Sequence, residues 1–105
     1  PSATEALLHA LAACLNTTFI YHAAARGVKV EELVIELDAE LDLRGLLGLS
    51  EKVRNGYSRI NLTFRVKADA SEETCRELCE LAKRRSPVYD MVSHGVAIET
   101  RCERR

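Results

Sequence analysis

The sequence lacks several features by which function is commonly recognised. Its net charge is only −1, from 15 basic and 16 acidic residues, and no block of five or six like charges occurs. Electrostatic capture of nucleic acid or of an anionic membrane is therefore not expected. The chain also has neither a Cys-x-x-Cys nor a His-x-x-x-His motif, so no metal site is predicted and no cofactor is indicated.

Tryptophan is absent and aromatic residues make up only 5%, while hydrophobic residues reach 47% and charged residues 30%. This composition is globular, neither disordered nor fibrous. A length of 105 residues predicts a single domain over 1–105. The four cysteines, at positions 14, 75, 79 and 102, lack the spacing of a small secreted disulfide scaffold, so a cytoplasmic location is expected.

The first segment is an uncharged run from Ala6 to Ala25, which has the nominal length of a membrane span. Its ends resemble those of a helix in water. Ser2 and Glu5 match a capping box, and Arg26 with Gly27 provides a last-turn cation and a stop. We therefore predict a water-soluble helix over 3–26, about 36 Å long, and no membrane partner. Because it is apolar nearly all round, other structure has to cover most of its sides.

Two later segments alternate with the period of a strand. In residues 33–43 the odd positions are apolar and the even positions after Val34 are acidic, whereas residues 60–68 place Arg65 and Lys67 on their polar face. Antiparallel pairing would bring the acidic and basic faces together. The connection over 45–58 is long for a simple turn, and a short helix is expected over Ser50–Asn55.

A second amphipathic helix is predicted to open at Ser71 and to end at Ser86 with Pro87, since the residue before a proline avoids the α region. The alternation from Val96 to Arg101 predicts a short final strand. The order helix, strand, strand, helix, strand indicates an α+β fold.

Most candidate functional residues have a simple structural explanation. Cys75 and Cys79 lie on the apolar stripe of the second helix and fit as small hydrophobic residues, while Cys102 is close to the C-terminus. His9 and His22 share a helix but project about 140° apart, so they form no common site.

Cys14 has a different context, in the middle of the first helix among alanines, with Thr18 one turn later on the same side. A reactive thiol needs a lowered pKa, and the helix dipole contributes little to the middle of a helix. Activation is therefore expected from an Arg or Lys that tertiary structure or a second subunit supplies.

Four segments, TEALLHALAACLNTT, RGVKVEELVIELDAELDLRGLLGL, VRNGYSRINLTFRVKADA and LAKRRSPVYD, together resemble the OsmC/Ohr family of osmotically inducible and organic hydroperoxide resistance proteins. The resemblance spans essentially the whole chain. It implies an α+β OsmC-like fold with a long central helix packed on a curved antiparallel sheet, in an intertwined homodimer. Strands that precede the central helix in the family are expected to be absent here, where the chain begins at Pro1.

The resemblance also implies thiol peroxidase chemistry, in which a cysteine of the central helix is oxidised by an organic hydroperoxide and a second cysteine, before a proline, forms a disulfide with it. Cys14 matches the first position, but Ser86 stands at the second, as in a branch with one cysteine. Ser86 could offer a hydrogen bond, and reduction would need an external thiol, or Cys75 or Cys79 within disulfide distance. The family's activating Arg lies on the preceding strands, and Glu5 falls near the acidic residue that partners it.

Two functions are therefore expected. The first is a one-cysteine thiol peroxidase of the oxidative stress response, with Cys14 and Glu5 as catalytic residues and Thr18 and Ser86 beside an apolar hydroperoxide. The alternative is a non-catalytic dimeric binding protein that holds an apolar small molecule in the same place. The missing second cysteine favours binding over efficient turnover.

Overall fold

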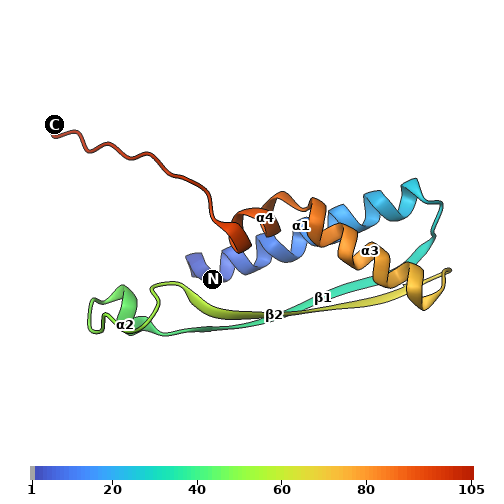
Figure 1. Cartoon of the computed structure of the whole chain (residues 1–105), viewed down its shortest axis with the longest axis horizontal. Helices are drawn as coiled ribbons and strands as arrows, with labels where there is room; N and C mark the ends of the chain where they lie inside the picture. Colours follow the sequence, from blue (N-terminus) through green and yellow to red (C-terminus); the bar gives the residue numbers. More distant parts are fainter. Residues whose placement is uncertain (1) are drawn as a thin grey trace.

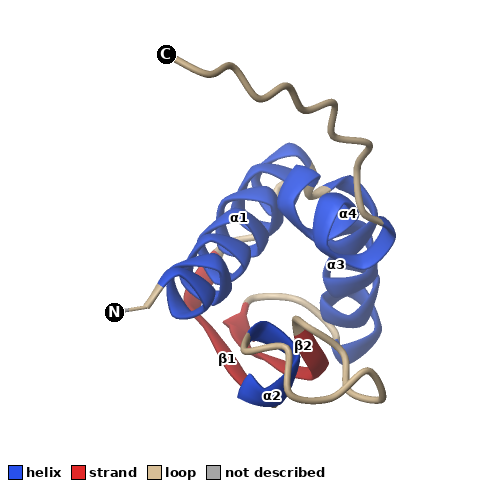
Figure 2. Ribbon diagram, turned by 90° about the vertical axis from the view of Figure 1, so that its left-hand side faces the viewer, coloured by secondary structure: helices blue, strands red, loops and turns tan. Residues whose placement is uncertain are grey.

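A computed structural model describes residues 2–105. Its elements are α1 (Ala3–Ala25), β1 (Val30–Leu41), α2 (Leu43–Leu46), β2 (Tyr57–Ala68), α3 (Glu72–Arg85) and α4 (Pro87–His94). β1 and β2 form a long antiparallel hairpin, and α1 and α3 lie over one of its faces (Figures 1 and 2). The α+β class is therefore confirmed.

Helix α1 begins and ends almost where its capping residues predict. The Ser2 hydroxyl accepts a hydrogen bond from the Glu5 N–H at 3.2 Å, and the Ser2 N–H donates to the Glu5 carboxylate at 3.1 Å. These bonds satisfy N–H groups that have no acceptor within the helix. At the other end Gly27 adopts a positive φ of 70°, which favours glycine and turns the chain toward β1.

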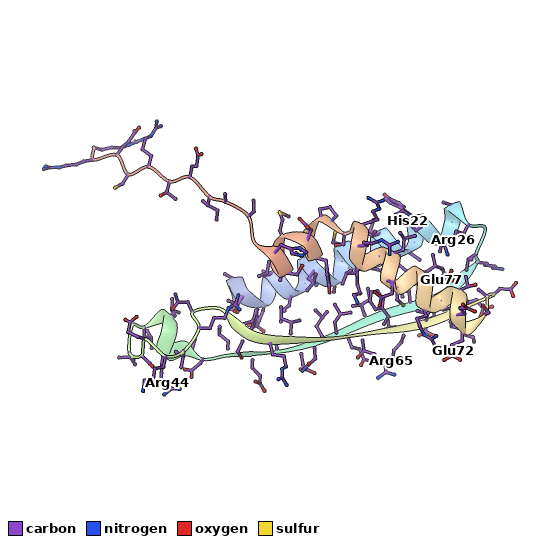
Figure 3. All side chains as sticks on the ribbon, viewed as in Figure 1. His22, Arg26, Arg44, Arg65, Glu72 and Glu77 are labelled. Carbon is purple, nitrogen blue, oxygen red and sulfur yellow. The ribbon has the colours of Figure 1, made fainter. Side chains whose placement is uncertain are left out.

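The hairpin pairs the two alternating segments in the predicted sense. Glu36 lies opposite Thr63, and its carboxylate binds the Arg65 guanidinium at 2.9 and 3.2 Å, while Asn61 donates to Asp38 at 2.8 Å. Arg65 points away from the helices in Figure 3, so this polar face is open to solvent. The strands begin earlier than the alternation suggests, at Val30 and Tyr57.

The core lies between α1 and α3, above the apolar face of the hairpin. Phe19 is fully buried, and its ring centroid lies 6.2 Å from that of Phe64 on β2. Among residues 2–105, the buried hydrophobic residues come from the two helices: Leu11, Leu15, Phe19, Ala23, Leu78 and Ala82. The hairpin side chains beneath them are only partly buried, because the sheet has two strands and extends beyond the helices.

The connection between the strands contains a short helix, but not at the predicted position. Residues 50–55 form no helix, and α2 lies at Leu43–Leu46 instead. The reason is the cap supplied by Asp42, whose carboxylate accepts hydrogen bonds from the Arg44 N–H and guanidinium. These bonds hold the pKa of Asp42 at about 2, so the cap stays ionised at any ordinary pH.

The predicted final strand is wrong. After Gly95, with φ at 77°, residues 95–105 form neither helix nor strand and run away from the body (Figure 1). Alternation selects which side chains share a face, but a strand also needs a neighbouring backbone to satisfy its hydrogen bonds. Val96 and Ile98 are consequently 64% and 79% exposed.

Ser86 and Pro87 end α3 as predicted, but they also begin α4, a helix that is not among the predicted elements. Ser86 is the cap of α4 and Pro87 its first residue. Proline suits that position because the first N–H of a helix needs no intrahelical acceptor. The chain therefore turns at Ser86 and places a second helix beside α1.

Helix α1 has one covered and one uncovered side. Among residues 2–105, α1 is the one helix that is long and apolar enough to cross a membrane. The core helix of a soluble protein meets the same two criteria. Four of its residues belong to the core described above. On its other side Leu7 and Tyr21 are 42% and 71% exposed.

We expect Phe19→Ala to lower the free energy of unfolding by about 3–5 kcal/mol, because it opens a cavity between α1 and β2. Urea unfolding followed by circular dichroism measures the change. Leu49→Ala is the matched control, since Leu49 is 70% exposed and its truncation should cost less than about 0.5 kcal/mol. Equal effects of both substitutions would contradict the assignment of Phe19 to the core.

Candidate functional site

The site forms where the middle of α1 meets the turn between α3 and α4. Cys14 is partly buried there, and its sulfur accepts a hydrogen bond from the Ser86 hydroxyl at 3.0 Å. Ser86 is only 1% exposed and is the one buried polar residue among those described. Two residues 72 positions apart in the chain thus come into direct contact.

Hydrogen bonds of its backbone and of its hydroxyl hold Ser86 in place. Its N–H donates to the Ala82 carbonyl oxygen at 2.9 Å and ends α3, while its hydroxyl oxygen accepts from the Tyr89 N–H at 3.1 Å and caps α4. A hydroxyl has a single hydrogen, which here goes to Cys14. The position and direction of the donor are therefore set by the two helix ends.

The environment of Cys14 favours its thiolate. Burial raises the pKa of the thiol, but hydrogen bonds from the Ser86 hydroxyl and from the Val88 N–H outweigh it, so the pKa lies below its ordinary value. Val88 is the second residue of α4, where N–H groups have no intrahelical partner and the helix dipole is positive. The N-terminus of α4 thus contributes a stabilisation that was expected from an Arg or Lys.

Thr18 lies beside Cys14 on α1, as its spacing predicts. Its hydroxyl donates to the Cys14 carbonyl oxygen at 2.7 Å. Of the three residues that lower the pKa of the Cys14 thiol, Thr18 has the smallest effect. The structure therefore brings Cys14, Thr18 and Ser86 together.

Glu5 lies elsewhere. Its carboxylate belongs to the capping box, where hydrogen bonds from Ser2 lower its pKa. It precedes Cys14 by nine residues on the same helix, which corresponds to about 13 Å along the axis. Within one chain, the structure does not bring Glu5 to the thiol.

The other thiols do not occupy the place that Ser86 takes. All four cysteines are free. Cys79 is seven residues before Ser86 on α3, about 10 Å along the helix axis. Burial first, and then the neighbouring Cys75 and Glu80, raise the pKa of the Cys79 thiol, which makes it a poorer nucleophile. Cys102 is exposed in the C-terminal segment, and no metal-binding cluster of three residues occurs between residues 2 and 105.

The sequence did contain a signal for the missed donors. Serine followed by proline, with Asp90 in the next turn, is a helix start as well as a helix stop. The prediction used this pair only as the end of α3. It therefore lacked α4 and the Val88 N–H at its start.

Comparisons with known proteins agree with this architecture. A model of the family described as OsmC-like protein matches residues 1–101. The fold is similar to the crystal structure of an OsmC like protein from Mycoplasma pneumoniae, with a TM-score of 0.74 and 22% sequence identity. The match covers 85% of this chain and 60% of that one, so this chain spans less than two thirds of that protein. None of the curated proteins matches the chain.

We expect Ser86→Ala to raise the pKa of Cys14, because the thiolate loses a hydrogen-bond donor. The measurement is the pH dependence of alkylation by iodoacetamide, read on tryptic fragment 1–26, which contains Cys14 alone. The midpoint should move to higher pH.

Ser71→Ala is the matched control, since Ser71 caps α3 in the same way but lies at its other end. It should cost about 1 kcal/mol of stability and leave the midpoint unchanged. An identical profile for Ser86→Ala and the unmodified protein would rule out the role given to this hydroxyl.

Proposed function

The chain belongs to the OsmC-like protein family, and from that premise we propose that it is a thiol-dependent peroxidase that reduces organic hydroperoxides through Cys14. The observation that carries the proposal is the partly buried Cys14 thiol, held at 3.0 Å by Ser86 and with a lowered pKa. A role in the response to oxidative stress in the cytoplasm follows from this chemistry and from the free cysteines.

The proposed reaction begins with the Cys14 thiolate attacking the distal oxygen of the hydroperoxide. A sulfur–oxygen bond forms and the oxygen–oxygen bond breaks, so sulfur loses two electrons and the peroxide gains them. Cys14 becomes a sulfenic acid, and the departing alkoxide takes a proton from water to give the alcohol. Ser86 and the Val88 N–H stabilise the attacking thiolate, while Thr18 fixes the backbone beside it.

Reduction of the sulfenic acid has to use a thiol from outside the site, because the group facing Cys14 is a hydroxyl. A first thiol forms a mixed disulfide with Cys14 and releases water. A second thiolate then breaks that disulfide, leaving the Cys14 thiolate and an oxidised disulfide product. The proposed enzyme is thus of the one-cysteine type.

The working form proposed here is a homodimer. The exposed side of α1 carries no charged residue from Ala6 to Ala25, and Leu7 and Tyr21 lie in line with Cys14, at intervals of seven residues. Such a face is unusual on a soluble monomer. The radius of gyration is 17.3 Å, whereas a compact domain of this length would have about 13 Å. A second copy against α1 would cover this face and enclose an apolar substrate beside Cys14.

The alternative is a dimeric binding protein that holds an apolar small molecule at the same place without chemistry. Ser86 favours it, since a hydroxyl cannot complete a disulfide cycle with Cys14. In that case Cys14→Ser would leave ligand affinity unchanged, and the unmodified protein would consume no hydroperoxide.

We expect one equivalent of cumene hydroperoxide to add one oxygen to fragment 1–26, trapped by dimedone as the sulfenic acid of Cys14. With excess thiol, the unmodified protein should turn over hydroperoxide, and Cys14→Ser should not. Cys102→Ser is the matched control and should retain the activity, because Cys102 is exposed and far along the chain. Unoxidised Cys14 together with no turnover would sink the peroxidase proposal.

A gain-of-function variant sharpens this test. Ser86→Cys places a second sulfur where an oxygen now lies 3.0 Å from the Cys14 sulfur. Hydroperoxide should then produce a disulfide between positions 14 and 86, seen as the loss of two hydrogens in the intact mass. Persistence of the sulfenic acid in this variant would contradict the proposed path of oxidation.

We expect sedimentation velocity to give twice the chain mass for the unmodified protein at micromolar concentration. Ala13→Glu, which puts a charge on the exposed side of α1, should shift the protein to monomers, because burying an unpaired carboxylate is costly. Thr63→Glu is the control, on the exposed outer face of the hairpin. A monomer at all concentrations would refute the dimer.

A further inference from the structure

We infer that the thiol that reduces Cys14 is anionic, and that Arg84 and Arg85, at the end of α3, select it by charge. This inference rests on the proposed function and names the class of its second substrate. It begins from the uneven distribution of charge around the thiol.

The α1 surface beside Cys14 contributes no charge, since no charged residue lies between Ala6 and Ala25. On α4 the nearest carboxylate is that of Asp90, which lies 3.2 Å from the His94 ring nitrogen Nδ1. The N-terminus of α4 adds the positive end of its dipole. Within one chain, the charged side chains beside this junction therefore come mainly from the end of α3.

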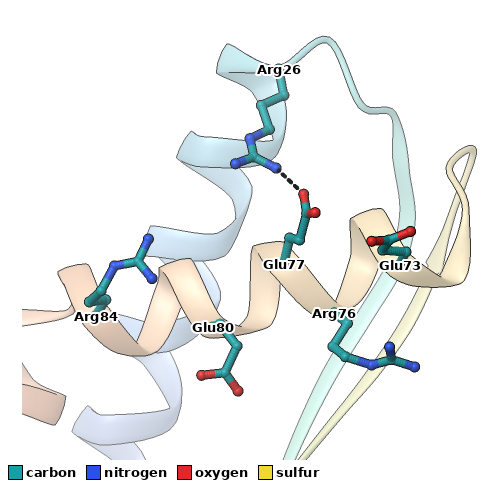
Figure 4. Close-up of a pocket in the computed structure, with 6 residues that line it drawn as sticks. All are labelled: Arg26, Glu73, Arg76, Glu77, Glu80 and Arg84. Atoms are coloured by element: carbon teal, nitrogen blue, oxygen red, sulfur yellow. Dashed lines mark hydrogen bonds and ion pairs between the residues drawn. The ribbon is translucent and has the colours of Figure 1, made fainter.

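The last turn of α3 holds three consecutive cations. Lys83 is paired with Glu80 at 3.2 Å. Arg84 and Arg85 are exposed, and neither has an ion-pair partner among residues 2–105. In Figure 4 the Arg84 guanidinium stands apart from the Arg26–Glu77 pair, although all three residues line the same pocket. Even when the carboxylate of Asp90 is included, the net charge of the side chains at this junction is positive.

Both arginines directly precede the residue that contacts the reacting sulfur. Arg85 is bonded directly to Ser86, whose hydroxyl touches the Cys14 sulfur at 3.0 Å, and Arg84 precedes it by one residue. Exposed charges influence one another over about one Debye length, which is about 10 Å at 0.1 M salt and longer at lower salt. A molecule that approaches Cys14 across this junction therefore passes through their field.

The two substrates respond differently to that field. A hydroperoxide reacts with Cys14 as a neutral molecule, and the uncharged side of α1 suits its apolar body. A thiol reacts only as its thiolate, so the atom that attacks is itself negative. Cations beside the junction of α3 and α4 favour that ionised form and attract further carboxylates on the same molecule, so they act on the reductive step.

The test separates this step from peroxide chemistry. Methyl methanethiosulfonate converts Cys14 to its methyl disulfide, and a thiolate then attacks the methyl sulfur, forming a new disulfide and releasing the Cys14 thiolate. Rates for 3-mercaptopropionate (anionic) and cysteamine (cationic) are each divided by the rate with the same disulfide of a free cysteine derivative. Fragment 1–26 reports on Cys14 alone.

At 10 mM salt the anionic thiol should be favoured about fivefold over the cationic one, and 1 M salt should remove most of the preference. The double variant Arg84→Gln/Arg85→Gln should abolish it. The control Arg54→Gln/Arg59→Gln removes the same formal charge from exposed positions near and on β2 and should retain it.

A preference that is absent, or that survives in the Arg84/Arg85 variant, would overturn the inference. Because no hydroperoxide is used, that outcome leaves the peroxidase proposal standing. Conversely, a preference that disappears as expected, in a protein that consumes no hydroperoxide, would support the charge selection and refute the peroxidase.

Discussion

The hydrogen bond between Ser86 and Cys14 links the middle of α1 to the junction of α3 and α4. It exists because α3 stops and α4 starts at the same residue, so Ser86 is buried between two helix ends and its hydroxyl faces α1. Pro87 enforces the turn without losing a hydrogen bond, since the first turn of a helix needs none from that N–H. The thiol is thereby placed at the positive end of a helix that is remote from it in the chain.

This arrangement explains how a cysteine in the middle of a helix acquires a lowered pKa. The dipole of α1 itself contributes little at Cys14, which lies near the centre of that helix. The N-terminus of α4 supplies two directed donors instead, and they more than offset the cost of partial burial. A second thiol at position 86 would also have been a partner for oxidation, so the hydroxyl separates stabilisation of the thiolate from disulfide formation.

The elements that were predictable share a repeating pattern or a cap. α1 was predictable from its capping serine and its uncharged apolar run, α3 from its capping serine and its apolar stripe, and the hairpin from alternation with opposite charges on its two strands. The failures lie where one local signal fits two structures. Ser86 with Pro87 suits both the end and the start of a helix, and the alternation after Gly95 indicates a face but no neighbour. Within the candidate site, Cys14, Thr18 and Ser86 were found in the sequence, whereas the Val88 N–H was not, because Ser86 and Pro87 also fit the end of a helix and α4 was not predicted.

The sequence by itself determined the periodicities, the caps and the uncharged length of α1, because these depend on side chains that are near neighbours in the chain. It also carried the family, through the order and spacing of four segments. Only the tertiary structure decided which groups surround Cys14. The direction of α4, the burial of Ser86 and the distance of Glu5 from the thiol depend on how helices pack across the hairpin, and packing joins residues whose separation in sequence says nothing about their separation in space.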